Sequence, residues 1–222
     1  MKTGKNLSRR QINKKMGIAA CLGLVTPALA FGKAVTPAQV EGPFHPITPQ
    51  TDTDMDLTLV EGHTESAQGE QILVRGRVLD TRGRPLKNAL VDVWQANALG
   101  RYSHPKDRNT APLDPNFQGW GLIRTDANGH YGFKTIKPGA YPLSVADKEG
   151  WRCRHIHFKV SRPGSRELIT QMYFHGDPLI ADDQQVAKVP EELQHLLIIK
   201  SVTDEQSGLP LFSFDLTLAS LD

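Results

Sequence analysis

Short segments in which apolar and polar residues alternate, separated by turns that contain glycine and proline, constrain the fold of this chain most strongly. In the first segment Ile72, Val74 and Val78 occupy alternate positions, and Arg75 and Arg77 lie between them. A period of two is that of a β-strand with one face turned to a core. By the same pattern we expect further strands at residues 89–94, 130–134, 154–160, 168–175 and 212–218.

Turn-forming residues separate these segments at 82–85, 126–129 and 137–139. Residues 190–197 look helical, because Pro190 would take the first helical position and two glutamates would lie in the first turn. Short strands at this spacing predict an all-β fold. We expect an antiparallel β-sandwich with long surface loops and one short helix near the C-terminus.

Charge and composition divide the chain into three regions. The chain has 26 basic and 24 acidic residues, but residues 1–30 contain six of the basic ones and no acidic one. The remainder carries a net charge of −4 and shows no basic stripe, so we do not expect it to bind nucleic acid.

Residues 31–70 are rich in proline, threonine, glycine and acidic side chains without a sustained period, which predicts an irregular N-terminal arm. Residues 71–222 are expected to form the sandwich as one domain.

Residues 1–30 have the three-part layout of a bacterial export signal. A basic segment at 1–15 precedes a weakly apolar one that ends in Ala-Leu-Ala at 28–30, which predicts cleavage after position 30. Arg9 and Arg10 lie in a segment that resembles a twin-arginine signal; a Sec signal that holds two adjacent arginines is the alternative. The apolar segment is too short for stable membrane insertion. We therefore expect an exported, periplasmic or extracellular protein.

The chain has two cysteines, and the predicted cleavage removes Cys21. Most of the apolar segment follows Cys21 instead of preceding it, which argues against a lipoprotein. Cys153 would then remain alone, without an internal disulfide, in spite of an oxidising destination.

His155 and His157 are separated by one residue in a predicted strand. Both side chains would lie on one face, while Ile156 and Phe158 face the core. Two imidazoles on one face can bind a metal ion, although a His-x-His strand is more often simply a polar face. Zinc would call for a further Cys, Asp or Glu ligand, and Cys153 would lie on the same face by the same alternation.

Tyr102 and Tyr141 each follow a glycine-containing turn and are further candidate ligands. A single tyrosine in either place would ordinarily be a packing residue with its hydroxyl satisfied. Two phenolates with two imidazoles would suit ferric iron better than a divalent metal, because phenolate oxygen is a hard anionic donor. The residue types alone leave these alternatives open. Four other histidines are expected to be structural or exposed: His104, His130, His175 and His195.

Seven short runs of residues carry a resemblance to a known family. Two of them are Gly-Arg-Tyr and His-Ile-His-Phe. The seven runs lie at residues 93–97, 100–102, 111–117, 135–142, 151–152, 155–158 and 171–180. In the order and spacing of these runs the chain resembles the intradiol ring-cleavage dioxygenases, and among them most closely the enzymes that act on protocatechuate. The resemblance extends over residues 40–218 and is densest between 90 and 180.

This resemblance implies a β-sandwich enzyme with one Fe(III) ion, held by Tyr102, Tyr141, His155 and His157. It implies insertion of both atoms of O2 into a catechol and cleavage of the ring between the two hydroxylated carbons, which gives a cis,cis-muconate. Protocatechuate is the favoured substrate, and catechol, hydroxyquinol or a larger catechol is the alternative. The expected partners are therefore a small aromatic diol and O2, and a homo-oligomer is left open.

The same resemblance implies catalytic roles for three residues. Arg152 would lie against the bound catechol and stabilise its electron-rich form with a fixed positive charge. Tyr141 would leave the metal and take up a catechol proton, and Gln171 would support the site from behind the ligands.

Some positions depart from the family pattern. Cys153 and Arg154 stand where the family commonly has Pro-Ala. Leu143 stands where the protocatechuate enzymes have a tryptophan that forms a pocket wall. The residue that would bind a substrate carboxylate is therefore open, with Lys106, Arg124 and Arg154 as candidates.

A non-catalytic binding module is the competing class. The turns and strands at 76–85 and 126–141 also resemble small transthyretin-like sandwiches, which bind surfaces or sugars. Such a module has no reason to keep Tyr102 together with His155 and His157, so the positions of these three side chains discriminate between the two classes.

Overall fold

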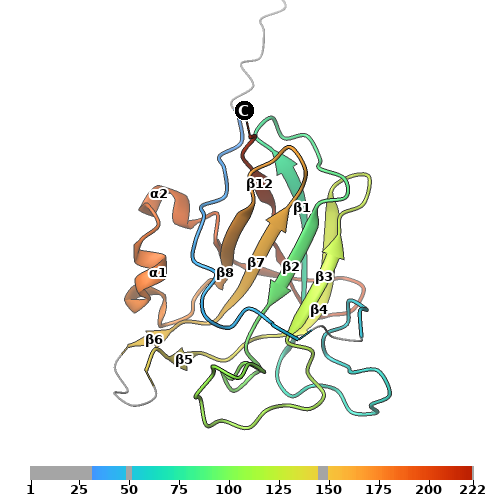
Figure 1. Ribbon diagram of the computed structural model, residues 1–222, viewed down its shortest axis with the longest axis vertical. Coiled ribbons are helices and arrows are strands. Elements are labelled where there is room, and N and C mark those ends of the chain that lie inside the picture. Colours follow the sequence, from blue (N-terminus) through green and yellow to red (C-terminus); the bar gives the residue numbers. More distant parts are fainter. Residues whose placement is uncertain (1–31, 49–51, 145–149, 222) are drawn as a thin grey trace, which may run out of the picture. The chain divides into compact units, whose positions relative to one another are not determined.

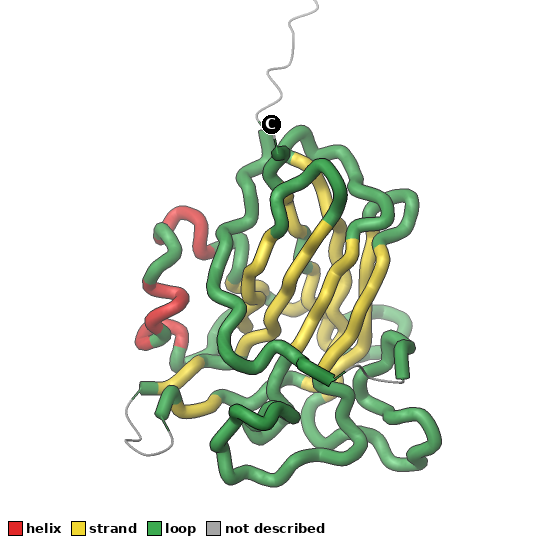
Figure 2. Tube along the Cα trace, viewed as in Figure 1, coloured by secondary structure: helices red, strands yellow, loops and turns green. Residues whose placement is uncertain are grey.

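The computed structural model describes residues 32–48, 52–144 and 150–221, and within these ranges the chain forms two five-stranded sheets arranged as two layers (Figures 1 and 2). The first sheet contains β10 (Ser201–Thr203), β11 (Pro210–Ser213), β1 (Gln71–Asp80) and β12 (Leu216–Leu218) in that order, with β4 (His130–Ile136) also paired to β1. The second sheet runs β3 (Trp120–Arg124), β2 (Leu90–Trp94), β7 (His155–Ser161), β8 (Leu168–Phe174) and β9 (Ile198–Ile199). A separate two-stranded sheet pairs β5 (Tyr141–Pro142) with β6 (Trp151–Arg152).

The hydrophobic core lies between the two large sheets, because alternate residues of their strands turn inward. Aromatic rings link the layers: the ring centroids of Phe158 and Phe214 are 5.0 Å apart, and those of Phe174 and Phe212 are 4.9 Å apart. All four rings are buried. The predicted all-β sandwich is confirmed, and each of the six segments with a period of two lies in a strand or a pair of strands.

The pairing of the strands is not antiparallel throughout. β1 runs parallel to both β11 and β12, and β8 runs parallel to β9. A period of two tells which face of a strand a residue occupies, but it carries no information on the direction of the neighbouring strand. The mixed character of both sheets could therefore not be predicted from the alternation.

The predicted strand at 212–218 is interrupted at Phe214 and Asp215, where side chains take over backbone hydrogen bonds. The Tyr131 hydroxyl donates to the Phe214 carbonyl oxygen at 2.5 Å, and the Asp215 carboxylate accepts from the Arg77 N–H at 2.9 Å. The alternation nevertheless continues across the interruption. A Cβ atom on Gly76 would overlap the Phe214 carbonyl group, so the closeness of the two chains here depends on a glycine.

β3 is a strand that the alternation does not predict. Its Leu122 side chain is 44% exposed, whereas a Cβ atom on the neighbouring Gly121 would lie 3.3 Å from Leu57 and from Val93. An exposed leucine beside an inward-facing glycine weakens the contrast between the two faces. The arm residue Leu57 fills the space that the glycine leaves.

Short helices follow β8 and lie together beside it (Figure 1): they are η1 (Ile180–Asp182), α1 (Gln184–Ala187) and α2 (Glu191–Gln194). The helix expected at 190–197 is α2, which is shorter than expected, and η1 and α1 precede it. Asp183 begins α1, with its carboxylate accepting from the N–H groups of Gln185 and Val186. None of the helices in the described ranges has the length and apolar character that crossing a membrane requires.

The arm forms no helix or strand in its described residues, 32–48 and 52–70, beyond an isolated bridge between Asp56 and Lys134. Backbone hydrogen bonds hold it to both sheets: Thr36 N–H donates to Thr217 O at 3.1 Å, and Gln39 N–H donates to Ile169 O at 2.7 Å. The predicted export signal at 1–30 lies outside the described residues.

We expect Gly76→Ala to lower the free energy of unfolding by about 1–3 kcal/mol, because the new methyl group meets backbone atoms that cannot move aside. Gly132→Ala in the paired strand β4 is the control, since its Cβ would meet the flexible Arg75 side chain at 3.1 Å. Urea denaturation of both variants measures the difference. Equal stability of the two variants would contradict the prediction.

Candidate metal centre and substrate cavity

Four side chains converge on one point at the end of the second sheet. The Nε2 atom of His155 lies 3.2 Å from Nε2 of His157, 3.4 Å from the Tyr141 hydroxyl oxygen and 3.5 Å from the Tyr102 hydroxyl oxygen. The two histidines and Tyr102 are buried, and Tyr141 is partly buried. The structure therefore brings together all four residues that the sequence analysis singled out as ligands.

β7 places the two histidines by simple alternation. His155 and His157 lie on one face of the strand, and Ile156 and Phe158 lie on the other, where both are fully buried in the core. The predicted division of this strand between site and core is thus observed. Cys153 precedes the strand, and its side chain belongs to the hydrophobic core cluster, so the alternation does not extend back to it.

The two tyrosines come from neighbouring loops that touch. Tyr102 follows Gly100, whose φ is +78° and whose Cβ atom, if present, would overlap the Ala140 carbonyl group. Tyr141 comes directly after Ala140 and begins β5. A second link between the loops is the hydrogen bond from Gly139 N–H to Asn97 O at 2.9 Å. The glycines are required here because any side chain would separate the loops and with them the phenol groups.

Contacts behind the histidines fix the orientation of both rings. The Nδ1–H of His155 donates to the Cys153 carbonyl oxygen at 2.7 Å, which leaves the lone pair of Nε2 directed at the centre. His157 stacks on Trp94 with the rings 4.8 Å apart and 6° from parallel. Its Nδ1 atom is buried and has no hydrogen-bond partner among the described residues.

Burial favours the neutral form of all four groups. It lowers the pKa of His155 and His157 well below the usual histidine value, and the positive charge of Arg152 lowers the pKa of both further. Burial also raises the pKa of Tyr102 and of Tyr141. Neutral imidazoles are ready metal ligands, whereas buried phenols ionise only beside a compensating cation.

The donor set fits ferric iron. Among the described residues no group of three or more His, Cys, Asp and Glu side chains could hold a metal, so a metal at this point has to use the tyrosines. Two potential phenolates supply hard anionic donors for a trivalent ion, and two neutral imidazole nitrogens complete the set. The alternative of a zinc ligand at Cys153 finds no support, because burial raises the pKa of this thiol well above its usual value and its side chain packs in the core.

Arg152 lies beside the centre in a buried ion pair. Its Nε donates to the Asp183 carboxylate at 2.9 Å, and its Nη2 donates to Gln171 Oε1 at 2.5 Å and to the Tyr173 hydroxyl at 3.5 Å. Burial alone would raise the pKa of Asp183, but the charge of Arg152 and several hydrogen bonds bring it below its usual value. The Cys153 N–H is one of these donors, at 3.0 Å. The guanidinium is therefore charged and held rigidly.

A cavity of about 640 Å³ opens beside Tyr141 and Arg152. Phe44 of the arm lies over the phenols at its inner end, with its ring 4.8 Å from that of Tyr102 and 6.2 Å from that of Tyr141. The cavity is large enough for a substituted benzene ring. It is the candidate substrate cavity, because it combines a group of the centre with the buried cation.

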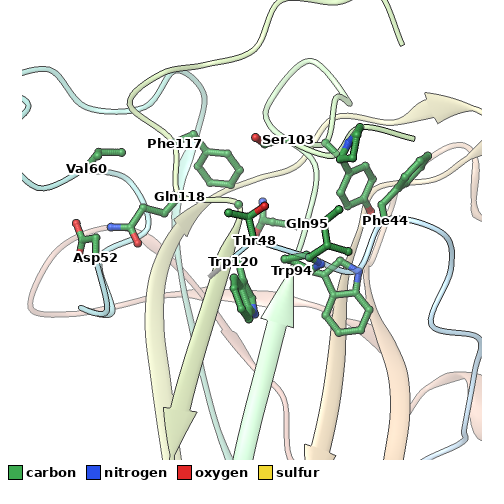
Figure 3. A pocket seen from close by; sticks show the side chains of 15 residues that line it. Phe44, Thr48, Asp52, Val60, Trp94, Gln95, Ser103, Phe117, Gln118 and Trp120 are labelled. Carbon is green, nitrogen blue, oxygen red and sulfur yellow. The ribbon is translucent and has the colours of Figure 1, made fainter. Parts of the chain in front are cut away.

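A second cavity, of about 520 Å³, also borders Phe44 and is drawn in Figure 3. Phe117 and Gln118 form its far side, and Trp94 and Trp120 lie below it in the view of Figure 3. Tyr102 is the one member of the four-residue centre that lines it, and Arg152 does not. It is therefore the weaker candidate for the substrate.

The candidate carboxylate-binding residues are separated by the fold. Lys106 lines the substrate cavity. Arg124 pairs with Leu90, at the opposite end of β2 from Trp94 and the centre. Arg154 is engaged with the Asp177 carboxylate, to which both its N–H and its Nη1 donate at 3.1 Å.

The structure also shows a residue that the sequence analysis missed. Asp183 holds Arg152, and no motif indicated it, since the pair is 31 positions apart.

The four histidines that were expected to be structural or exposed lie outside the centre. His104 is buried, and its Nδ1 accepts from the Lys106 N–H at 3.1 Å. The other histidines expected to be structural or exposed lie on the surface: His130, His175 and His195.

The fold and the site define a β-sandwich protein with a buried centre of two tyrosines and two histidines. Residues 40–220 match a family model described as Dioxygenase. The protocatechuate 3,4-dioxygenase beta chain of Burkholderia cepacia is 49% identical over 173 residues, which are 76% of this chain and 73% of that protein. Catechol 1,2-dioxygenase 2 of Acinetobacter lwoffii is 39% identical over 158 residues, 67% of this chain and 54% of that protein. The chain thus spans about half of the length of this second relative.

Solved structures agree. The dioxygenase domain of a dioxygenase carbohydrate-binding protein fusion from Streptomyces sp. SirexAA-E has a TM-score of 0.62 at 29% identity, over 84% of this chain and 99% of that one. 3-Chlorocatechol 1,2-dioxygenase from Rhodococcus opacus 1CP has a TM-score of 0.64 at 26% identity, over 83% of this chain and 72% of that one. The chain belongs to the intradiol ring-cleavage dioxygenase family.

We expect Asp183→Asn to lower the free energy of unfolding at pH 7 by about 3–5 kcal/mol, because it leaves the buried Arg152 charge without its partner. The folded-state pKa of Asp183 lies below that of the unfolded chain, so its stabilising contribution is complete above about pH 4 and is lost as the pH falls through the folded-state value. Denaturation of wild type and variant between pH 7 and pH 3 should show the difference shrinking with acid. A difference that is constant over this range would contradict the ion-pair explanation.

Proposed function

We propose that the chain is a non-haem Fe(III) intradiol dioxygenase that cleaves a catechol between its two hydroxylated carbons and gives a cis,cis-muconate. The observation that carries the proposal is the convergence of Tyr102, Tyr141, His155 and His157 on one point beside a cavity with a buried guanidinium. The family supplies the reaction class.

The four residues would hold the metal through two phenolic oxygens and two Nε2 atoms. When bound, ferric iron would withdraw electron density from a catechol ring and make a ring carbon reactive towards dioxygen. Tyr141 lines the substrate cavity, whereas Tyr102 does not. We therefore assign to the Tyr141 oxygen, which would be a phenolate while it serves as a metal ligand, the uptake of a proton from a catechol hydroxyl. Burial raises the pKa of Tyr141, which favours the protonated phenol that results.

Arg152 would stabilise the negative charge that develops on the substrate. Its guanidinium lines the cavity and is fixed before substrate arrives, so no reorganisation is needed during the reaction. Gln171 contributes by holding Nη2 with Oε1, while its Nε2 donates to Val40 O of the arm at 3.2 Å. Gln171 is thus a positioning residue between Arg152 and the arm.

Protocatechuate is the substrate that we propose, and catechol or hydroxyquinol is the alternative, since relatives are named for all three. Leu143 at the cavity is 49% exposed and leaves the wall open where the protocatechuate enzymes have a tryptophan. A homo-oligomer is part of the proposal, because Leu143 and Trp151 expose apolar surface around the β5–β6 pair.

We expect Tyr102→Phe and His157→Ala to lose most of the bound iron and the turnover, because each removes a ligand atom. The measurement is the visible absorption of the iron-reconstituted mature chain, without oxygen, before and after addition of protocatechuate. Bound tyrosinate gives a charge-transfer band, which should shift with the catechol in wild type and be lost or weakened in the variants. Tyr131→Phe is the control, since this buried tyrosine bonds to Phe214 O away from the centre. A colourless wild type after iron loading would sink the metal assignment.

We also propose that the protein is exported by the twin-arginine route. In a bacterial host with a twin-arginine translocase, replacement of Arg9 and Arg10 by lysine should leave the uncleaved chain in the cytoplasm. Cell fractionation followed by mass determination of the N-terminus measures both location and cleavage. Undiminished export of the double variant would favour a Sec signal.

A further inference from the structure

The outer part of the substrate cavity carries two cations that the proposed reaction does not use. Lys106 and Arg108 both line the cavity together with Tyr141 and Arg152, and both are exposed. Within the described part of the chain neither side chain forms an ion pair. Arg152, by contrast, is buried and already engaged with Asp183.

The loop that carries these cations is tied to the metal centre. The Asp107 carboxylate, between Lys106 and Arg108, accepts from the Tyr102 N–H at 2.7 Å and from the Asn109 N–H at 2.8 Å. The Asn109 side chain in turn donates to Gly100 O at 2.9 Å. The backbone of the loop is therefore held at a fixed place relative to the Tyr102 phenol.

Asp107 does not cancel the two cations. It is the one acidic residue among the described residues that line the cavity, and its two oxygens are turned to backbone N–H groups. The described cavity lining thus has an excess of positive charge. Lys106 and Arg108 lie at the rim, and the four-residue centre lies at the inner end. A field of this sign favours an anionic ligand.

Apolar residues form much of the rest of the wall. The arm contributes Val40, Pro43 and Phe44, the last of these at the inner end. Pro142 of β5 and the following Leu143 line the cavity as well. Such a wall suits an aromatic ring that lies between the centre and the cationic rim. A ring with its hydroxyls at the centre would direct a substituent on the far side towards the rim.

We propose that Lys106 and Arg108 form a subsite for an anionic substituent on the catechol ring, and that this subsite selects carboxylated catechols over neutral ones. The inference rests on the proposed function and identifies the substrate class of the same site. Of the three candidates from the sequence, the fold leaves Lys106, and it adds Arg108 as its companion, since Arg124 and Arg154 lie elsewhere or are engaged.

The test compares protocatechuate with 3,4-dihydroxybenzamide, a neutral molecule of nearly the same shape, and with catechol. The Lys106→Gln/Arg108→Gln double variant should lose about 10–100-fold in kcat/KM for protocatechuate, through KM, because a charge-assisted contact is lost in ground and transition states alike. Its kcat/KM for the amide and for catechol should stay within about 2-fold of wild type, since neither carries the charge.

The matched control is Arg166→Gln/Lys200→Gln, which removes the same charge from exposed positions that do not line the cavity. Its kcat/KM for all three substrates should equal that of wild type. This control separates the effect of the local subsite from a general attraction of anions by the charge of the protein. Anaerobic calorimetric titration with protocatechuate measures the affinity loss in the Lys106/Arg108 variant without turnover.

The two levels of the proposal fail differently. If the iron-loaded wild type turns over none of the three catechols, the proposed function fails and the subsite fails with it. The subsite alone is overturned if wild type is active and the Lys106/Arg108 variant retains its affinity for protocatechuate. It is also overturned if the variant loses kcat/KM by the same factor for protocatechuate, the amide and catechol.

Discussion

The alternation of side chains along β7 is the constraint on which the rest of the site depends. One strand has to serve two buried environments at once, because Ile156 and Phe158 pack in the core while His155 and His157 face the centre. A shift of one residue in the register with β2 or β8 would exchange the two sets and destroy both environments. The stability of the sandwich therefore fixes the position of the imidazoles, and the candidate metal centre has a geometry that the core already enforces.

β7 positions the two histidines, and a buried polar network positions Arg152 beside them. Asp183 joins β6 to α1, because it accepts from Arg152 and Cys153 on one side and from the first turn of α1 on the other. Gln171 on β8 extends the network to Val40 of the arm. A charge this deeply buried is tolerated only with its partners in place. The elements that look peripheral, the short helices and the arm, thus position the buried guanidinium.

Local pattern and motif could predict much of this. The period of two predicted six strand segments and the division of β7 between His155 and Ile156, since the direction of a side chain in a strand depends only on its position. The pattern failed at β3, where Gly121 and the exposed Leu122 remove the contrast between faces, and at the parallel pairs of β1 and β8. Asp183 was missed because nothing in its neighbourhood refers to a residue 31 positions away.

The sequence by itself determined the six alternating strand segments, the faces of their side chains and the four candidate ligands, because each of these depends on local spacing or on recognisable runs of residues. Only the tertiary structure decided that Tyr102 and Tyr141 reach His155 from two loops that touch at Gly100 and Ala140. It also decided that Lys106 lies at the substrate cavity while Arg124 lies at the far end of its strand. The physical reason is that distance along the chain does not set distance in space once strands pair and loops pack, so the neighbours of a charge are a property of the fold.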